Sequence, residues 1–260
     1  MTLKPLRIVQ LSDCHVAADP QASYRGQNAD RNLSAVLEAV KGWKPEVILL
    51  TGDVSEDGSR PSYQRVSERV GECGVPVLAL PGNHDEPAVM RDGFPAGPWD
   101  GPHLSRIGDW RLVLLDSTER GRVSGLLDRS SLEWLESELN SGKEGHHLVA
   151  LHHQPVAVDA PWIDRYRLES PQDFLDLVDR SPSVRGVLWG HIHQDFRQDR
   201  NGVAFLGAPS TVANSLPGTD RFTLDGAGPA CRWLELHPDG AIRTGLLNAS
   251  GSGEGAERPG

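Results

Sequence analysis

The chain has 260 residues, a length that allows one large α/β domain with its own hydrophobic core. Hydrophobic residues make up 38% of it, and no apolar run reaches the roughly 18 residues of a membrane-spanning helix, so we expect no membrane partner. The formal net charge of −10 argues against binding to nucleic acid, because proteins that bind duplexes usually present a basic face.

Short apolar runs recur along the chain, and most of them end in polar, potentially reactive residues. Continuous apolar runs of this kind are typical of strands that are buried on both faces. In chain order, the runs and the polar residues that follow are Leu6–Leu11 with Asp13 and His15, Val47–Leu50 with Asp53, Val75–Leu80 with Asn83, His84 and Asp85, Leu112–Leu115 with Asp116, Leu148–Leu151 with His152 and His153, and Val187–Trp189 with His191 and His193.

Helical patterns lie between several of these runs. Apolar residues in segment 33–40 follow the i, i+3, i+4, i+7 spacing of an amphipathic helix. Ser130 and Glu133 resemble a capping box before a second helix, and Ser170-Pro171 resembles the start of a third. Strands that alternate with helices predict an α/β layered domain.

The last part of the domain differs, because three strand-like runs occur within 202–247 with no helical pattern between them. We expect a single catalytic domain over residues 1–247. Residues 248–260 are rich in Gly and Ser, which predicts a disordered tail. Segment 86–110 contains several prolines, and we expect a long loop there, near the functional site.

The polar residues at the strand ends are expected to meet, because ligands of an open α/β sheet bind beyond the carboxyl ends of its strands. Aspartate, asparagine and histidine without thiolates suit iron, manganese, zinc or cobalt. Seven candidate ligands are too many for one ion with open positions, but they suit two ions that share a bridging ligand and clamp a phosphoryl group. The ligand candidates are Asp13, His15, Asp53, Asn83, His152, His191 and His193.

Each of these motifs alone also has a plain structural interpretation. An aspartate after a strand is often a turn or cap residue, and Gly52-Asp53 is a common turn sequence. His152 and His153 could be one core and one surface imidazole. The occurrence of all the motifs in order, each after a predicted strand, favours the metal site over these separate explanations.

The series Asp-x-His, Gly-Asp, Gly-Asn-His-Asp, His-His and Gly-His-x-His resembles the signature of the calcineurin-like metallophosphoesterase superfamily, over residues from about 6 to about 247. Within it, the chain is most similar to the bacterial class III 3′,5′-cyclic AMP phosphodiesterases. Stretches that carry this second resemblance include Gly26-Gln27-Asn28, Trp162-Ile163-Asp164 and Pro209-Ser210-Thr211. The resemblance implies a four-layer α/β/β/α sandwich with two mixed sheets and a dimetal site at one rim.

The resemblance also implies a role for each ligand candidate. Asp13, His15 and His193 would hold one ion, commonly iron, while Asn83, His152 and His191 would hold a second, iron or manganese. Zinc or cobalt are the alternatives. Asp53 would bridge the two ions, because its two carboxylate oxygens can serve both. We choose His152 over His153 because His152 directly follows the apolar run, and we expect Cys14 to pack in the core.

His84 would be catalytic rather than a ligand. It would hydrogen-bond the phosphate or protonate the leaving oxygen, while a metal-bridging hydroxide attacks. The residues expected to contact the substrate are His15, Asp53, Asn83, His84 and His193.

The function that the resemblance implies is hydrolysis of 3′,5′-cyclic AMP to 5′-AMP, with a small phosphodiester as the partner. The alternative is a phosphodiesterase or pyrophosphatase that acts on a glycerophosphodiester, a nucleotide-sugar or a lipid pyrophosphate, and a more distant one is a non-catalytic scaffold. The pocket walls would decide between substrates, and we expect them to come from loops 16–30, 86–110, 155–170 and 209–220. The sequence predicts no particular oligomeric state.

The cysteines and the N-terminus favour a cytoplasmic location. Cys14, Cys73 and Cys231 are an odd number at wide spacings, which predicts neither a disulfide framework nor a metal knuckle. The first residues pass directly into a strand-like run and show no signal peptide.

Overall fold

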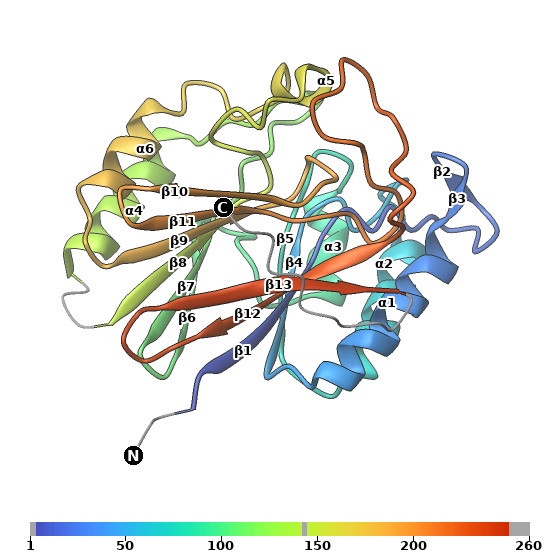
Figure 1. Cartoon of the computed structure of the whole chain (residues 1–260), viewed down its shortest axis with the longest axis horizontal. Helices are drawn as coiled ribbons and strands as arrows, with labels where there is room; N and C mark the ends of the chain where they lie inside the picture. The colour runs from blue at the N-terminus through green and yellow to red at the C-terminus, as the bar shows by residue number, and fades with distance from the viewer. Residues whose placement is uncertain (1–3, 142–144, 250–260) are drawn as a thin grey trace.

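The computed structural model describes residues 4–141 and 145–249 and shows two β-sheets packed face to face between two layers of helices (Figure 1). The predicted four-layer sandwich is confirmed. The first sheet contains, in spatial order, β13 (Ile242–Asn248), β12 (Ala230–Leu236), β1 (Leu6–Leu11), β4 (Val47–Thr51) and β5 (Val77–Leu80). The second contains β10 (Phe196–Arg200), β11 (Val203–Gly207), β9 (Val184–Trp189), β8 (His146–Ala150), β7 (Trp110–Leu114) and β6 (His103–Ile107).

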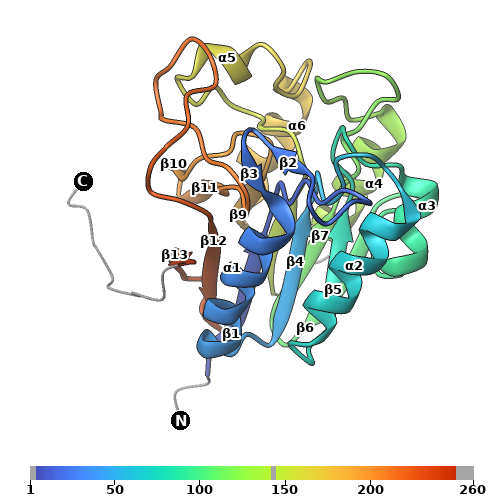
Figure 2. The same cartoon turned by 90° about the vertical axis from the view of Figure 1, so that its right-hand side faces the viewer.

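Helices cover the outer face of each sheet (Figure 2). The first sheet is covered by α1 (Ala29–Trp43), α2 (Arg60–Gly71) and α3 (Pro87–Gly93), and the second by α4 (Arg129–Ser141) and α6 (Gln172–Asp179). A short hairpin of β2 (Ser23–Tyr24) and β3 (Gln27–Asn28) precedes α1, and the single turn α5 (Pro161–Asp164) precedes α6.

Three clusters of buried apolar side chains hold the layers together. The central cluster joins the two sheets, for example through Ile8 and Leu49 of the first and Leu148 and Leu188 of the second. The other two clusters lie between each sheet and its helices. The central strands are buried on both faces, as their continuous apolar runs predict, and every residue of β4 is buried.

Parallel strands point their carboxyl ends at one rim of the sandwich. In the first sheet β1, β4 and β5 are parallel, and in the second β7, β8, β9 and β11 are parallel. The antiparallel pairs β1–β12 and β12–β13 contain the C-terminal strands that the sequence predicted. The chain segments that leave the parallel strands therefore lie next to one another at the same rim.

Two local predictions were wrong. Segment 86–110 is not one long loop, because it contains α3 and β6; Pro87 lies in the first turn of α3, where its missing N–H costs no hydrogen bond. Ser130 does not cap α4, because the backbone N–H of Ser131 donates to the carboxylate of Asp128 at 2.7 Å. Aspartate is as good a helix cap as serine, so the helix begins earlier than predicted.

The expected tail lies mostly outside the described residues, which end at Ala249, and β13 extends to Asn248, one residue past the expected domain boundary. Within the described part of the chain, no helix is long and apolar enough to cross a membrane.

Candidate metal centre

The side chains that were predicted to meet at the rim do meet there. Asp13 and His15 follow β1, Asp53 follows β4, and Asn83 and His84 follow β5 in the first sheet; His152 follows β8, and His191 and His193 follow β9 in the second. Groups of ligand atoms within 4.8 Å of one another link the two sheets, among them Asp13 with His15 and His193, and Asp13 with Asp53 and His152.

The backbone at this rim is strained. Asp13, His15, Asp53, His191 and His193 have φ values of 51°, 44°, 49°, 66° and 52°. Positive φ is uncommon for residues other than glycine, and strain of this kind costs on the order of 1–3 kcal/mol per residue. Strained backbone persists where the side chain at that position is needed. The positive φ values of five predicted ligands therefore indicate that these side chains have a function.

The first group of ligands consists of Asp13, His15 and His193. The Nδ1 atom of His15 lies 2.7 Å from Glu56, and that of His193 lies 2.8 Å from the carbonyl of Ala213. Because these partners are acceptors, both imidazoles carry their proton on Nδ1. Their bare Nε2 atoms then face each other at 3.3 Å, and His193 Nε2 lies 3.3 Å from Asp13 Oδ1. Facing lone pairs beside a carboxylate suit a cation that all three side chains can bind.

The second group consists of Asn83, His152 and His191. His152 donates from Nδ1 to the carbonyl of Thr51 at 2.7 Å, which turns Nε2 towards Asp53. Among the described residues, His152 Nε2, His191 Nε2 and Asn83 Oδ1 are buried and have no hydrogen-bond partner. A buried polar atom without a partner is costly, so three such atoms at one rim fit a group that supplies positive charge. The residues therefore fit a second metal ion.

Asp53 lies between the two groups. Its Oδ2 atom is 3.7 Å from His15 Nε2 and 3.5 Å from His152 Nε2. Its Oδ1 atom accepts the backbone N–H of His84 at 2.9 Å, so a single oxygen faces both groups where we had expected two. Burial raises the pKa of Asp53, but His152 and His15 outweigh burial and hold it well below its usual range. Asp53 is thus an ionised carboxylate in a site rich in imidazole.

The rim is packed too closely for side chains at its glycines. A Cβ on Gly52 would meet the ring of His152 and would lie 2.7 Å from the backbone nitrogen of Gly82. A Cβ on Gly190 would meet Ser12 and would lie 2.8 Å from Asp13 Oδ2. Glycine is therefore required at both positions so that strands of the two sheets can bring their ligands together.

His152 and His153 differ in what their nitrogens contact. His153 is bonded through both nitrogens, to Ser117 at 2.9 Å and to the carbonyl of Val123 at 3.1 Å. His153 is therefore engaged within the fold, whereas the Nε2 atom of His152 faces Asp53 at 3.5 Å. Cys14 is fully buried in the core beneath α1, and burial raises the pKa of its thiol to about 12, so it offers no thiolate.

Glu56 was missed by sequence reasoning. Its Oε2 atom lies 2.7 Å from His15 Nδ1 and 3.2 Å from His84 Nδ1, so one carboxylate orients a ligand and the predicted catalytic imidazole. Burial lowers the pKa of His84, but Glu56 and Asp53 outweigh burial and raise it to about 9. The only signal in the sequence was proximity, because Glu56 follows Asp53 by three residues in the same loop.

Asp85 and Asp116 also follow strands at this rim, but their carboxylates contact different groups. Asp85 accepts the backbone N–H groups of Val54 and Ser55 at 3.2 and 2.9 Å, and of Gly82 at 2.9 Å. It therefore joins the loop after β4 to the loop after β5. Asp116 accepts only from Thr118 among the described hydrogen bonds, so it supports its own turn.

Comparisons with known proteins agree with this geometry. The sequence model of the calcineurin-like phosphoesterase family matches residues 6–195 of this chain. The 3′,5′-cyclic adenosine monophosphate phosphodiesterase CpdA of Pseudomonas aeruginosa is 39% identical over 245 residues, which cover 92% of this chain and 88% of that protein. A 3′,5′-cyclic-nucleotide phosphodiesterase of Nostoc is 34% identical over 242 residues, which cover 92% of this chain and 91% of that protein.

A solved structure shows the same fold. A dimetal phosphatase from Danio rerio superimposes with a TM-score of 0.68 at 16% identity, over 94% of this chain and 99% of that one. The family match spans the strands and loops that deliver the rim residues from Asp13 to His193. By its sequence and by its fold, this chain belongs to the calcineurin-like phosphoesterase family.

Proposed function

We propose that the protein hydrolyses 3′,5′-cyclic AMP to 5′-AMP with two metal ions bound at the rim. The names of its relatives support the substrate, because cyclic nucleotide phosphodiesterases align with 92% of the chain at 34–39% identity. The site supports the chemistry, because it gathers carboxylate, amide and imidazole ligands for two ions. Its three cysteines are free, which fits a cytoplasmic enzyme.

The ligand sets follow from which atoms are available. Asp13, His15 and His193 would hold one ion, and Asn83, His152 and His191 would hold the other. Asp53 would be shared, because its Oδ2 atom faces His15 and His152. Oxygen and imidazole donors without sulfur suit iron paired with iron or manganese.

When bound, two metal ions supply positive charge for a phosphodiester and lower the pKa of water to about 7. His84 provides the other polar contact with the phosphate. It is held by Glu56 at 3.2 Å and is partly exposed, so its ring can donate a hydrogen bond to the phosphate or a proton to the leaving sugar oxygen. Asp85 keeps the loops of Asp53 and His84 together, which orients both for the same substrate.

One observation carries the proposal most directly. In the described part of the chain, the buried ligand atoms of His152, His191 and Asn83 have no hydrogen-bond partner. Other buried polar atoms of the described residues also lack partners, such as both ring nitrogens of His147, but these three are metal-ligand types that follow neighbouring strands at one rim. The arrangement is explained if metal ions bind them.

The experiment is turnover of cyclic AMP by purified protein loaded with manganese or iron, with bis(p-nitrophenyl) phosphate as a second substrate. We expect activity on both, and we expect a chelator to abolish it. Activity on the aryl ester alone would reject cyclic AMP and retain the phosphodiesterase. Protein that binds two ions and hydrolyses neither compound would contradict the proposed function.

A further inference from the structure

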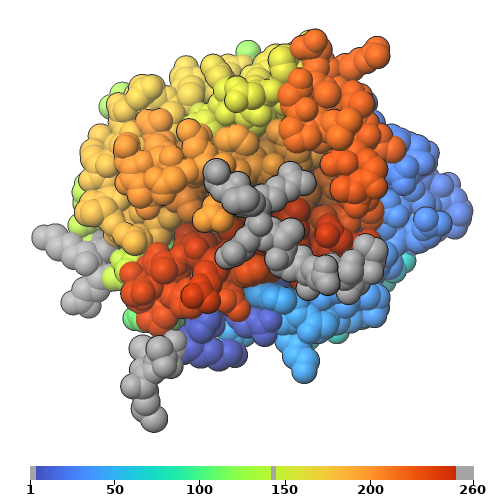
Figure 3. All heavy atoms as spheres, viewed as in Figure 1, coloured from blue at the N-terminus to red at the C-terminus, as the bar shows by residue number. Residues whose placement is uncertain are grey.

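Three aromatic rings from separate segments border the ligand His193. Tyr24 belongs to β2, Trp162 to α5, and Phe222 to the loop between β11 and β12. Their ring centroids lie 5.8, 6.4 and 6.1 Å from that of His193. In Figure 1 the loop between β11 and β12 lies between α5 and the β2–β3 hairpin, and in Figure 2 it runs along one side of both. The space-filling view shows this loop, in orange, projecting at the edge of the molecule beside the blue N-terminal segment (Figure 3).

Trp162 is held rigidly beside the metal centre. The carboxylate of Asp164 accepts the backbone N–H groups of Val158 and Ala160 at 2.9 and 3.1 Å and closes the turn around the indole. Ile163 is buried and receives a hydrogen bond on its carbonyl from Gln154 at 3.1 Å. These contacts explain the Trp-Ile-Asp stretch that the sequence singled out, since Ile163 and Asp164 anchor the turn that presents Trp162.

The indole of Trp162 has an unused donor. Its Nε1 atom is buried and, within the described residues, has no hydrogen-bond partner. Buried tryptophan N–H groups usually find an acceptor. An acceptor from a bound molecule would satisfy this one, and that molecule would lie against His193 at the metal centre.

Phe222 packs against Trp162 and is also fixed in place. The N–H of Leu216 donates to the carbonyl of Thr223 at 2.8 Å, and the N–H of Ser215 donates to the carbonyl of His193 at 2.8 Å. The Phe222 ring stands edge-on to Trp162 with a centroid separation of 5.4 Å, and the guanidinium of Arg25 lies 4.5 Å from its centre. The loop that carries Phe222 is thus tied directly to a predicted metal ligand.

The surroundings of these rings are apolar and open. Trp162, Phe222 and Tyr24 are half-buried, and none belongs to the fully buried part of a core cluster. On the same loop as Phe222, Leu216 and Leu224 are 41% and 45% exposed. Flat apolar surface beside a rim of carboxylates and imidazoles suits a ligand with a charged end and an aromatic end.

From this juxtaposition we propose that Trp162 and Phe222, supported by Tyr24 and Arg25, form a subsite for the nucleobase of the substrate. The inference rests on the proposed function and deepens it, because it names the part of the substrate that the protein selects. The base lies against the rings, and one of the ring nitrogens of adenine accepts a hydrogen bond from Trp162 Nε1. Phosphodiesters without a base lack these contacts and bind less tightly.

The test compares two ligands that share a sugar phosphate, of which one has a base and the other has none. Calorimetry on the manganese-loaded full chain would measure the affinity for 5′-AMP and for ribose 5-phosphate, and the ratio of the two isolates the base. Stacking of a base on aromatic side chains is worth enough to predict a ratio of about 10 or more in the wild type. In Trp162→Leu and in Phe222→Leu the ratio should fall about fivefold or more, with the affinity for ribose 5-phosphate unchanged.

The matched control is Tyr166→Leu. Tyr166 is an exposed aromatic residue, four positions after Trp162, that contacts Arg165 instead of the rim. In Tyr166→Leu, the ratio of the affinities for 5′-AMP and ribose 5-phosphate should equal that of the wild type. A wild-type ratio near 1, or a ratio unchanged in both Trp162→Leu and Phe222→Leu, overturns the subsite. If one variant does not fold, the other variant and the wild-type ratio still decide. A high ratio in protein that does not hydrolyse cyclic AMP would reject the proposed function and keep the subsite.

Discussion

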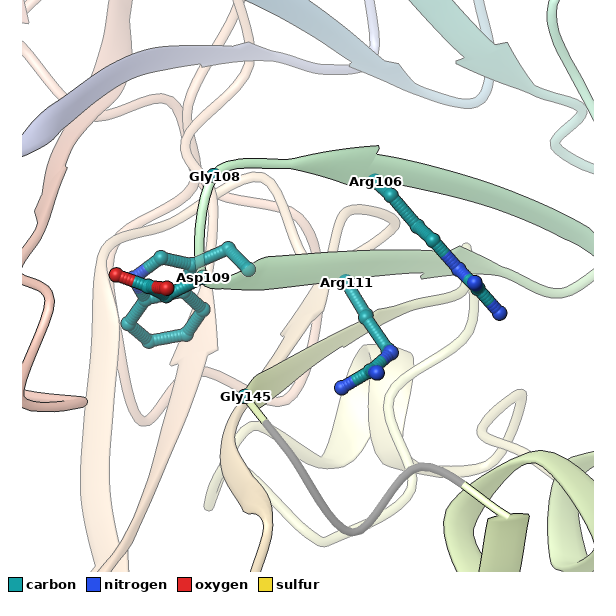
Figure 4. A pocket seen from close by; sticks show the side chains of 6 residues that line it. Arg106, Gly108, Asp109, Arg111 and Gly145 are labelled. Carbon is teal, nitrogen blue, oxygen red and sulfur yellow. The ribbon is translucent and has the colours of Figure 1, made fainter.

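The two ends of the second sheet both carry clusters of polar residues, but the clusters are built differently. At the amino ends of the strands, Arg106, Arg111 and His147 surround the carboxylate of Glu138 at 3.7, 3.8 and 3.9 Å. Arg106 and Arg111 also line a cavity of about 210 Å³ beside Gly145 (Figure 4). In this far-end cluster the two guanidinium groups face one carboxylate, while burial lowers the pKa of His147. At the carboxyl ends, carboxylates also lie beside imidazoles, but there the ligand atoms of several residues gather within 4.8 Å of one another.

The backbone shows the same contrast. At the far end, positive φ occurs at Gly108, Gly145 and Gly240, at 56°, 98° and 86°, and also at Asn201 in the turn between β10 and β11, at 55°. Glycine adopts these angles without steric cost. At the rim the positive φ values belong to Asp13, His15, Asp53, His191 and His193. The rim ligands account for five of the ten non-glycine residues with positive φ in the described chain, and there the chain keeps the reactive side chain and tolerates the strain.

The largest effect expected at the rim is from Asp53→Asn. Asparagine accepts a positive φ, so the fold should remain, but a neutral amide cannot offset two cations. We expect turnover to fall by a factor of about 10³ or more and the metal content to fall with it. Elemental analysis and turnover of the purified variant measure both. The control is Asp116→Asn. The carboxylate of Asp116 follows β7 and accepts hydrogen bonds only from Thr118 among the described contacts, so this variant should keep both metal ions. Two ions per chain in Asp53→Asn would disprove the bridging role.

His84→Ala should separate catalysis from metal binding. His84 faces Glu56 and Asp53 but is not needed to complete either ligand group. We expect a rate lower by a factor of about 10² with the metal content unchanged. His103→Ala replaces another histidine, at the end of the edge strand β6, and should leave the rate unaltered. An unchanged rate in His84→Ala would remove His84 from the mechanism.

A pair of glycine substitutions compares the two ends directly. Gly52 at the rim and Gly145 at the far end have φ of 90° and 98°, and in both a Cβ would meet neighbouring atoms. Each change to alanine should lower the free energy of unfolding by about 1–3 kcal/mol, measured with urea. Only Gly52→Ala should also reduce turnover per folded molecule, because its Cβ displaces His152. Equal turnover losses in the two variants would show that the contrast between the ends is false.

The smallest effect concerns acid stability at the far end. Burial and the charge of Arg111 lower the pKa of His147 from 6.5 to about 4. Between these values the unfolded chain binds a proton that the folded chain does not, so stability decreases as the pH falls. From pH 7 to pH 5, the wild type should lose about 1–2 kcal/mol more than His147→Leu, measured by urea unfolding in chelator. The same loss in both proteins would mean that His147 is protonated in the folded state.

The rim could be predicted from the sequence because parallel strands impose it. Once Asp53 and His152 were placed after buried apolar runs, the carboxyl ends of the strands brought them together. Glu56 lies outside that pattern, since it reaches His15 and His84 from within a loop whose course only the fold determines. The loops that carry Tyr24 and Trp162 were expected to form pocket walls, but the contact of Trp162 with Phe222 was not predicted, because the two rings are distant in sequence and meet through two loops.

Helix boundaries were predicted less well than strand ends. Asp128 caps α4 although Ser130 had the better matching pattern, because several residues there can serve as caps and packing decides among them. Prolines in 86–110 suggested a loop, but Pro87 starts α3, where the ring fits the first turn. Local signals of this kind allow two outcomes, and tertiary packing selects one.

The most direct test of the two-metal site is anomalous X-ray diffraction from crystals of the manganese-loaded protein. We predict two peaks about 3.5–4 Å apart, one next to Asp13, His15 and His193 and the other next to Asn83, His152 and His191, with Asp53 between them. A single peak, or two peaks that His153 rather than His152 contacts, would contradict the ligand sets proposed for this rim.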